Sequence, residues 1–353
     1  AGKTFGAPDA PTTVAELARS LKNDPDLIYQ HVRNNIEYYP KWGIHKGAVG
    51  ALIDGTGTAF DQALLLRDTL RAAEFTADLV KGTLRMLPAD AASWLGVDVV
   101  NTCTVSSRFS SGGTPTRTYN VSPGTCGTFV MIEVEHVWVQ VNIGGINYFF
   151  DPSIKPRAVG ARPNLAAITG YNRTTFLGNT VATAGATVTA DSVLNLNRAN
   201  VRATLTTYAN NLATHIRANN PHGALHDVLG GPGPITADFP SAPQRLTALL
   251  PTCPGPGAVM ITQRCQVAPP VVMREGNADP ATDVNAFRVD LRVQFLGIDK
   301  TYTSHALYGR RLTITFNTSN VPELRLDGTL EASGTAASPG TNVSVAMTVT
   351  HRV

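Results

Sequence analysis

The residues best suited to chemistry are a histidine inside an apolar strand and an aspartate shortly after it. His136 lies in the run Glu-His-Val-Trp at 135–138, and Asp151 follows a Gly-Gly pair at 144–145 and two phenylalanines. If the glycines form a two-residue turn, Asp151 is the diagonal neighbour of His136, at a Cα separation of about 7–8 Å that two side chains can close. A carboxylate there would fix the imidazole tautomer and stabilise its protonated form, as in a nucleophile–His–Asp triad. The pair itself lacks a nucleophile.

A helix expected from residue 58 to residue 73 is the element that would position that nucleophile. Thr58 and Asp61 form a capping-box pattern, and Ala63, Leu66 and Leu70 follow at helical spacing. Backbone N–H groups at a helix start lower the pKa of a thiol and can hold an oxyanion. The first turn of this helix is therefore where a catalytic thiol belongs.

Four segments around these elements form a recognisable pattern: Gly57-Thr-Ala59-Phe-Asp61-Gln-Ala63, Leu70-Arg71-Ala72-Ala73, His136-Val-Trp138-Val and Asp151-Pro152. This pattern resembles the core signature of the transglutaminase-like superfamily of papain-type cysteine enzymes. A further set resembles transglutaminase-like modules of large bacterial surface proteins: Ile28-Tyr-Gln-His-Val-Arg-Asn-Asn-Ile-Glu-Tyr38, Val80-Lys-Gly82-Thr83 and Leu307-Tyr-Gly309-Arg-Arg-Leu312. The resemblance spans residues 24 to about 156 and, more loosely, the tail. It implies an α+β fold with a helix packed on an antiparallel sheet and catalytic roles for His136 and Asp151. It also implies that the other ring nitrogen of His136 points toward the Cβ of Ala59. We expect no cofactor and no metal.

Ala59 occupies the nucleophile position, where the resemblance implies a cysteine. Alanine cannot attack a carbonyl, and we expect all four cysteines of the chain to lie in loops, far from any helix start. Two explanations remain: a natural module that lost its nucleophile, or a variant in which an original cysteine was replaced. We favour the first, because Phe60-Asp61-Gln62 also differs from the commonest catalytic surroundings. Without a thiol, His136 and Asp151 serve equally well as a buried hydrogen-bonded pair.

The four cysteines fall into two local pairs, which predict the disulfides Cys103–Cys126 and Cys253–Cys265. Local pairing is the simplest of three possible connectivities, because closing a short loop costs less chain entropy than crossing between domains. The absence of a C-x-x-C motif and of a nearby histidine argues against zinc or redox chemistry. Two bridges indicate an oxidising compartment, and therefore an exported protein.

Composition excludes several classes of function. Charged residues make up 16% of the 353 residues, against a typical share of about 25%, and the net charge is +3 without a basic cluster. Nucleic acid is therefore not an expected partner. No apolar run approaches the roughly 18 residues that cross a bilayer, so we expect no membrane span in this chain. The first ten residues lack the pattern of a signal peptide, and the chain is interpreted as already processed.

Three domains are expected: a transglutaminase-like domain over residues 1–180, a helical connector with a Pro/Gly-rich disulfide loop region over 181–275, and a β-sandwich-like module over 276–353. Helices are predicted over 13–39 and 193–216, strands over 77–84 and 129–143, and a long loop over 103–126. The predicted function is that of a catalytically silent module of an exported or cell-surface protein. It would bind a protein partner, or assemble with other parts of a larger surface protein. The alternative is a thiol-dependent acyl-transfer enzyme, whether transglutaminase, amidase or cysteine peptidase, with its nucleophile replaced by Ala59.

Overall fold

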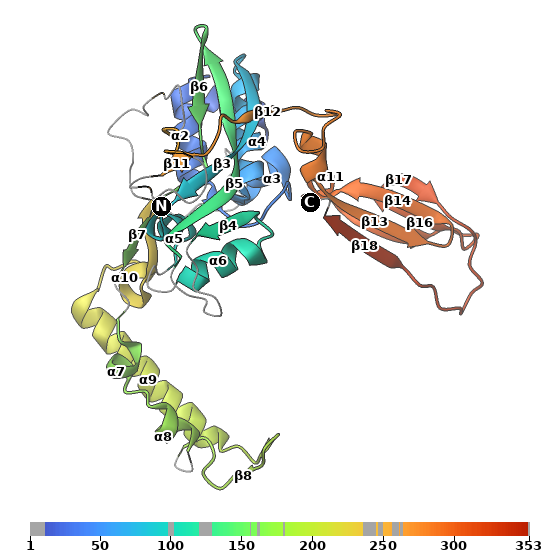
Figure 1. Ribbon diagram of the computed structural model, residues 1–353. Helices are drawn as coiled ribbons and strands as arrows, with labels where there is room; N and C mark the ends of the chain where they lie inside the picture. The colour runs from blue at the N-terminus through green and yellow to red at the C-terminus, as the bar shows by residue number, and fades with distance from the viewer. Residues whose placement is uncertain are drawn as a thin grey trace. The chain divides into compact units, whose positions relative to one another are not determined.

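The computed structural model is a mixed α+β protein with several antiparallel sheets (Figure 1). It describes residues 11–97, 102–119, 129–155, 157–160, 163–178, 181–235, 245, 250–255, 261 and 264–351. By its contacts the chain forms two units. The first, here called the core unit, comprises Ala1–Leu95, Val99–Pro156 and Ala237–Val353, and the second, the helical unit, comprises Gly96–Asp98 and Arg157–Thr236. These limits differ from the boundaries expected at residues 180 and 275, because the C-terminal sheets share contacts with the first domain.

Two long antiparallel strands, β3 (Thr76–Met86) and β5 (Met131–Ile143), form the centre of the main sheet. Strands β4 (Thr116–Tyr119) and β6 (Ile146–Phe150) pair with β5, whereas β11 (Cys265–Gln266) and β12 (Val271–Met273) pair with β3. The β5–β6 hairpin pairs Val139 with Phe150 and Ile143 with Ile146, which confirms the register predicted from the glycine turn. Gly144 and Gly145 both have positive φ, as that turn requires.

Helix α4 (Ala59–Ala72) packs on the main sheet against β3 and β5, and α1 (Val14–Ser20), α2 (Pro25–Asn35) and α3 (Gly47–Asp54) pack against α4. Its start at the Thr58–Asp61 capping box confirms the prediction. Two-residue strands, β1 (Glu37–Tyr38) and β2 (Thr56–Gly57), pair in parallel just before α4. The start of α4 is therefore fixed by a backbone ladder as well as by its cap.

Residues 103–126, expected to be a long loop, instead contain the helix α6 (Thr102–Ser111) and the strand β4, with residues 120–128 outside the described part of the chain. The expectation that no cysteine lies at a helix start is therefore wrong for Cys103, the second residue of α6. The Ser/Thr-rich composition concealed two apolar side chains at helical spacing, Val105 and Phe109, which are both fully buried. Phe109 packs against Trp94 of α5 (Pro88–Leu95), with 5.5 Å between the ring centroids.

The C-terminal segment forms two three-stranded antiparallel sheets. The first sheet has the order β14 (Ile298–Thr303), β13 (Val289–Phe295) and β18 (Ala346–His351), and the second has β15 (Leu312–Phe316), β16 (Pro322–Leu326) and β17 (Thr329–Ser333). Val293 and Leu324 belong to one apolar cluster between the two sheets. Two short helices, η1 (Val284–Phe287) and α11 (Ser304–Leu307), flank β13 and β14 in the sequence.

Contacts through η1 join these sheets to helix α4 and to the loop before α3. Phe287 stacks on Phe60 of α4, with ring centroids 4.8 Å apart, and its carbonyl accepts a 2.7 Å hydrogen bond from the Ile44 N–H. Gly43 has a φ of +89°, and a Cβ on it would lie 2.8 Å from that carbonyl oxygen. The close approach of the two backbones therefore requires glycine at position 43.

The helical unit is built around α9 (Arg198–Asn219), which contains no buried residue. Strands β7 (Arg157–Gly160) and β10 (Gly231–Ile235) pair at the two ends of this unit in the sequence. Between them lie α7 (Leu165–Thr169), α8 (Arg173–Leu177), β8 (Thr187–Val188), β9 (Val193–Leu194) and α10 (Leu225–Leu229). The expected helix start at 193 is wrong, because 193–194 pair with β8 and Asn197 caps α9. Among the described residues, no helix has the length and apolarity needed to cross a membrane.

Candidate histidine–aspartate site

His136 and Asp151 lie together in the core unit, as predicted from the hairpin register. The Nε2 atom of His136 is 2.8 Å from Oδ2 of Asp151, and the two residues are 1% and 4% exposed. The Tyr29 hydroxyl donates a 2.9 Å hydrogen bond to the Asp151 carbonyl, and its ring stacks on Phe150. The main chain that presents Asp151 is therefore fixed by helix α2.

Ser153 completes the polar group, although the sequence analysis did not identify it as a site residue. Its N–H and its hydroxyl each donate a 2.9 Å hydrogen bond to Oδ1 of Asp151, and the hydroxyl lies 3.2 Å from Nε2 of His136. The hairpin register contained the signal for this residue, because its extension places Ser153 opposite His136. Fully buried, Ser153 acts as a support for the carboxylate.

The surroundings of Asp151 keep it ionised. Burial alone raises the pKa of a carboxyl group, but the charge of His136 and the hydrogen bonds from His136 and Ser153 outweigh it. The pKa of Asp151 therefore lies below its ordinary value of 3.8. An ionised carboxylate next to imidazole is the arrangement that orients a general base.

Aromatic side chains enclose the imidazole ring. Trp94 meets it edge-on at 5.1 Å between centroids, and Trp138 lies nearly parallel to it at 5.9 Å. The Trp94 indole N–H donates to the Ser153 carbonyl, and Tyr38 stacks on Trp94. Trp138 also crosses Gly82, where an added Cβ would lie 2.7 Å from the indole ring. The ring of His136 is thus packed as a core side chain.

Ala59, the position of the expected nucleophile, begins α4 and is 4% exposed. It belongs to the apolar cluster that contains Val137, the residue after His136. Successive strand residues point to opposite faces of a sheet, so the His136 ring lies on the face away from the Val137 side chain. Both polar contacts of the ring use Nε2. The expected approach of its other nitrogen, Nδ1, to Ala59 stays a prediction.

Asp61, two residues further along α4, holds a loop in place. Its Oδ1 accepts hydrogen bonds from the N–H groups of His45, Lys46 and Gly47 at 2.8–3.0 Å, and its Oδ2 accepts one from Thr58 at 3.1 Å. Sequence reasoning assigned Asp61 only to the capping box. The three hydrogen bonds from residues 45–47 join positions 14–16 apart in the sequence, and no local sequence pattern predicts them.

Of the predicted disulfides, Cys253–Cys265 is confirmed, with a Cα–Cα distance of 4.9 Å. Cys103 takes part in a disulfide, whereas its predicted partner Cys126 lies outside the described residues. No group of three or more His, Cys, Asp or Glu side chains within the described ranges is arranged to hold a metal ion.

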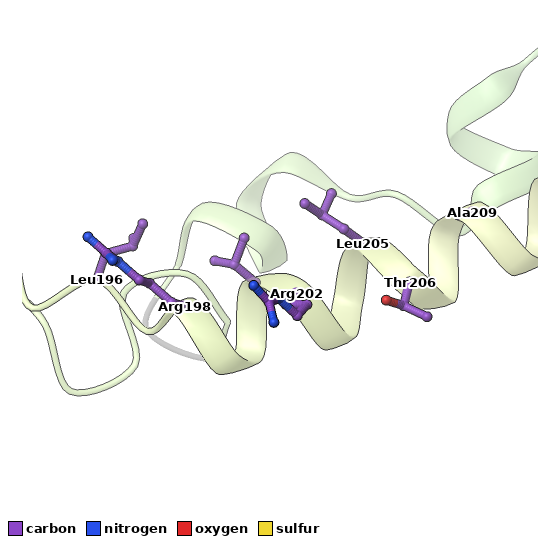
Figure 2. Close-up of a pocket in the computed structure, with 7 residues that line it drawn as sticks. Leu196, Arg198, Arg202, Leu205, Thr206 and Ala209 are labelled. Atoms are coloured by element: carbon purple, nitrogen blue, oxygen red, sulfur yellow. The ribbon is translucent and has the colours of Figure 1, made fainter.

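A shallow hollow lies on the helical unit, away in the sequence from the histidine pair (Figure 2). Its lining comes from α9 and the turn before it: Leu196, Arg198, Val201, Arg202, Leu205, Thr206 and Ala209. Leu196 and Leu205 are 44% and 51% exposed. The hollow is therefore an open, apolar and basic surface.

Comparisons with models of known families, with curated proteins and with solved structures found no match to this chain. The function is therefore inferred from the geometry of the site and from the sequence resemblance.

Proposed function

We propose that this protein is a catalytically silent transglutaminase-like module of an exported protein, acting in binding or structural assembly. The observation that carries the proposal is a buried, complete His136–Asp151 pair accompanied by alanine at position 59. The pair retains the geometry of two members of a triad, but Ala59, at the position of the expected nucleophile, carries no group that can attack a carbonyl.

The packing around the pair supports a structural role. His136 and Ala59 are both almost completely buried, and Trp94 and Trp138 occupy the space beside the imidazole. A substrate carbonyl must reach the nucleophile and the base together, within hydrogen-bond distance. In a buried pair, losing one partner leaves the other unsatisfied at a cost of about 1–3 kcal/mol, which is sufficient reason to retain both.

The helical unit supports a binding role. Residues 157–236 include six arginines and two aspartates and no lysine or glutamate. Arg198 and Arg202 lie beside the exposed Leu196 and Leu205 on the surface shown in Figure 2. Exposed apolar side chains beside arginines are typical of protein interaction surfaces. The Cys253–Cys265 disulfide is compatible with an extracellular location.

Restoring a thiol with Ala59→Cys separates this function from the alternative of a silenced acyl-transfer enzyme. In a structural module, the thiol ionises no more readily than a free one. Iodoacetamide then alkylates it about 100-fold more slowly at pH 6 than at pH 8.5, because a group with a pKa of about 8.5 is hardly ionised at pH 6. Alkylation is followed by mass spectrometry, and activity with an amide and an ester substrate.

The alternative has one observation in its favour, the 2.8 Å contact between His136 and Asp151. If the enzyme alternative is correct, the thiol of the Ala59→Cys variant is alkylated at similar rates at pH 6 and pH 8.5, and the variant turns over the substrates. That behaviour must disappear when His136→Ala is added, because the imidazole is what activates the thiol. Such a result contradicts the proposed silent module. Fast alkylation that persists when Ala59→Cys is combined with His136→Ala shows only that the thiol is exposed. That result contradicts the alternative of a silenced enzyme.

A further inference from the structure

The last strand of the C-terminal module, β18, forms the edge of its sheet. Among the described strands it pairs with β13 alone, and all six of its residues are exposed. The strand contains no charged residue and no proline, whereas β14, the other edge of the same sheet, includes Asp299 and Lys300. Edge strands are ordinarily protected from pairing with other chains by such residues. β18 lacks this protection.

One face of β18 is apolar and continues the inner face of the sandwich. Met347 pairs with Val293 and Val349 pairs with Leu291, and Val293 is fully buried against the second sheet. Residues paired across strands share a face, so Met347 and Val349 belong to the inner side as well. They are nevertheless 63% and 68% exposed.

The second sheet also has exposed apolar side chains on its inner face, at the strand β15. Ile314 and Phe316 of β15 continue the face of the buried Leu324, yet they are 36% and 49% exposed. Contacts between the sheets include β14 with β17, the strands at the opposite ends from β18 and β15. The sandwich is therefore closed along one side and open along the side of β18.

The free backbone groups of β18 lie on the same residues as its apolar side chains. The β13–β14 hairpin closes with the pair Phe295–Ile298 around two residues, and such a closing pair is hydrogen-bonded. Alternation along β13 then directs the N–H and C=O groups of Arg292 toward its β18 partner, Thr348. The backbone groups of Met347 and Val349 consequently point outward, toward an edge on which none of the described strands lies.

We propose that β18 pairs in antiparallel orientation with β18 of a second copy of this chain, about a twofold axis at Thr348. The two three-stranded sheets would become one six-stranded sheet. In this register Met347 lies opposite Val349 of the second copy, so apolar side chains meet on the inner face and the outward backbone groups form hydrogen bonds.

The free edge of β18 is complementary to β18 of a second copy of this chain. A twofold axis normal to the sheet keeps the inner faces of both copies on one side, and the same uncharged strand supplies the free edge and the apolar side chains twice. No like-charge repulsion opposes the contact. Pairing through β18 does not depend on the chemistry of His136.

Thr348→Cys in the full chain tests the register directly. Thr348 would form a non-hydrogen-bonded pair with its own copy, at a Cα separation of about 4.5 Å, which a disulfide can bridge. Under mild oxidation this variant should give a disulfide-linked dimer at least tenfold faster than Lys300→Cys on the opposite edge. Equal cross-linking of the two variants would overturn the proposal.

Light scattering with size-exclusion chromatography gives the second measurement. The unmodified chain should form a dimer whose dissociation constant rises at least tenfold on Val349→Lys, because a charge then enters the apolar face of the shared sheet. Val349 is exposed within one copy, so circular dichroism should show that the variant remains folded. A monomer at every concentration tested, leaving the edge for a strand of another protein, or a dimer that Val349→Lys leaves unchanged, would each overturn the proposal.

Discussion

At the scale of single residues, Asp151 connects three parts of the core unit through its carboxylate and its main-chain carbonyl. It binds the imidazole of β5 through Oδ2, and through Oδ1 it accepts hydrogen bonds from Ser153 and the Ile154 N–H. Its own carbonyl accepts the Tyr29 hydroxyl of α2. These hydrogen bonds stabilise the fold fully only while the Asp151 carboxyl group is ionised.

Asp151→Asn should therefore destabilise the fold in a pH-dependent way. At pH 7 we expect a loss of about 2 kcal/mol, in the range for hydrogen bonds to a charged group. The native pKa is lowered, so the stabilisation is fully present above the unfolded value near 3.8 and disappears as the pH falls through the native value. The difference in unfolding free energy between the two proteins should shrink below about pH 4, as measured by urea unfolding at several pH values.

A difference that stays constant from pH 7 to pH 3.5 would contradict this account of Asp151. Ser153→Ala is the matched variant, because it removes one donor and keeps the carboxylate. It should reduce stability by about 1 kcal/mol and raise the native pKa of Asp151 toward 3.8, so the stability lost on acidification becomes smaller.

At the scale of elements, Asp61 fastens the loop before α3 to the start of α4. Its carboxylate replaces backbone partners for three consecutive N–H groups and also caps its own helix. The Thr58 hydroxyl, which accepts from the Asp61 N–H, donates to the Gly43 carbonyl at 2.8 Å. Helix and loop therefore form a single hydrogen-bonded unit.

Asp61→Ala should lower the free energy of unfolding by about 3 kcal/mol, because it removes a cap and leaves several buried N–H groups unsatisfied. Asp61→Asn retains an acceptor oxygen and should cost less. Glu74→Gln, an exposed carboxylate just after the same helix, is the control and should change stability by less than about 0.5 kcal/mol. Urea unfolding followed by tryptophan fluorescence measures all three; equal effects of Asp61→Ala and Glu74→Gln would contradict the role of Asp61.

These two carboxylates also show what sequence reasoning could reach. The pairing of His136 with Asp151 was predictable because a two-residue glycine turn fixes the register of its whole hairpin. The capping role of Asp61 was predictable because its partner is three residues away. Its bonds to residues 45–47 were not, since they depend on how a loop folds back over the helix. Helix α6 was missed because two buried side chains outweigh a Ser/Thr-rich composition.

At the scale of the whole molecule, the two units are stabilised by very different amounts of burial. All three tryptophans, Trp42, Trp94 and Trp138, are buried in the core unit. In the helical unit, α9 is the longest helix among the described residues, with 22 residues, and it buries none of them. Most helical stability in proteins comes from packing an apolar face. Beyond its own hydrogen bonds, α9 has the Asn211 amide, which donates to the Thr169 carbonyl, and a small ring cluster.

That cluster joins Tyr208 of α9 to Tyr171 and Phe176, with ring centroids 5.8 Å and 6.2 Å apart. It is the contact most able to hold α9 against the short helices before it. Aromatic pairs of this kind contribute about 0.5–1.5 kcal/mol each beyond the area that they bury.

The units should therefore unfold in separate steps. Far-UV circular dichroism, which reports α9 as well as the core helices, should begin to fall at a lower urea concentration than tryptophan emission, which reports the core unit alone. Tyr208→Ala should move the early step to still lower urea and leave the tryptophan transition unchanged, because no tryptophan lies in the helical unit. If circular dichroism and tryptophan emission instead change at the same urea concentration, and Tyr208→Ala shifts both, the chain unfolds in one cooperative step.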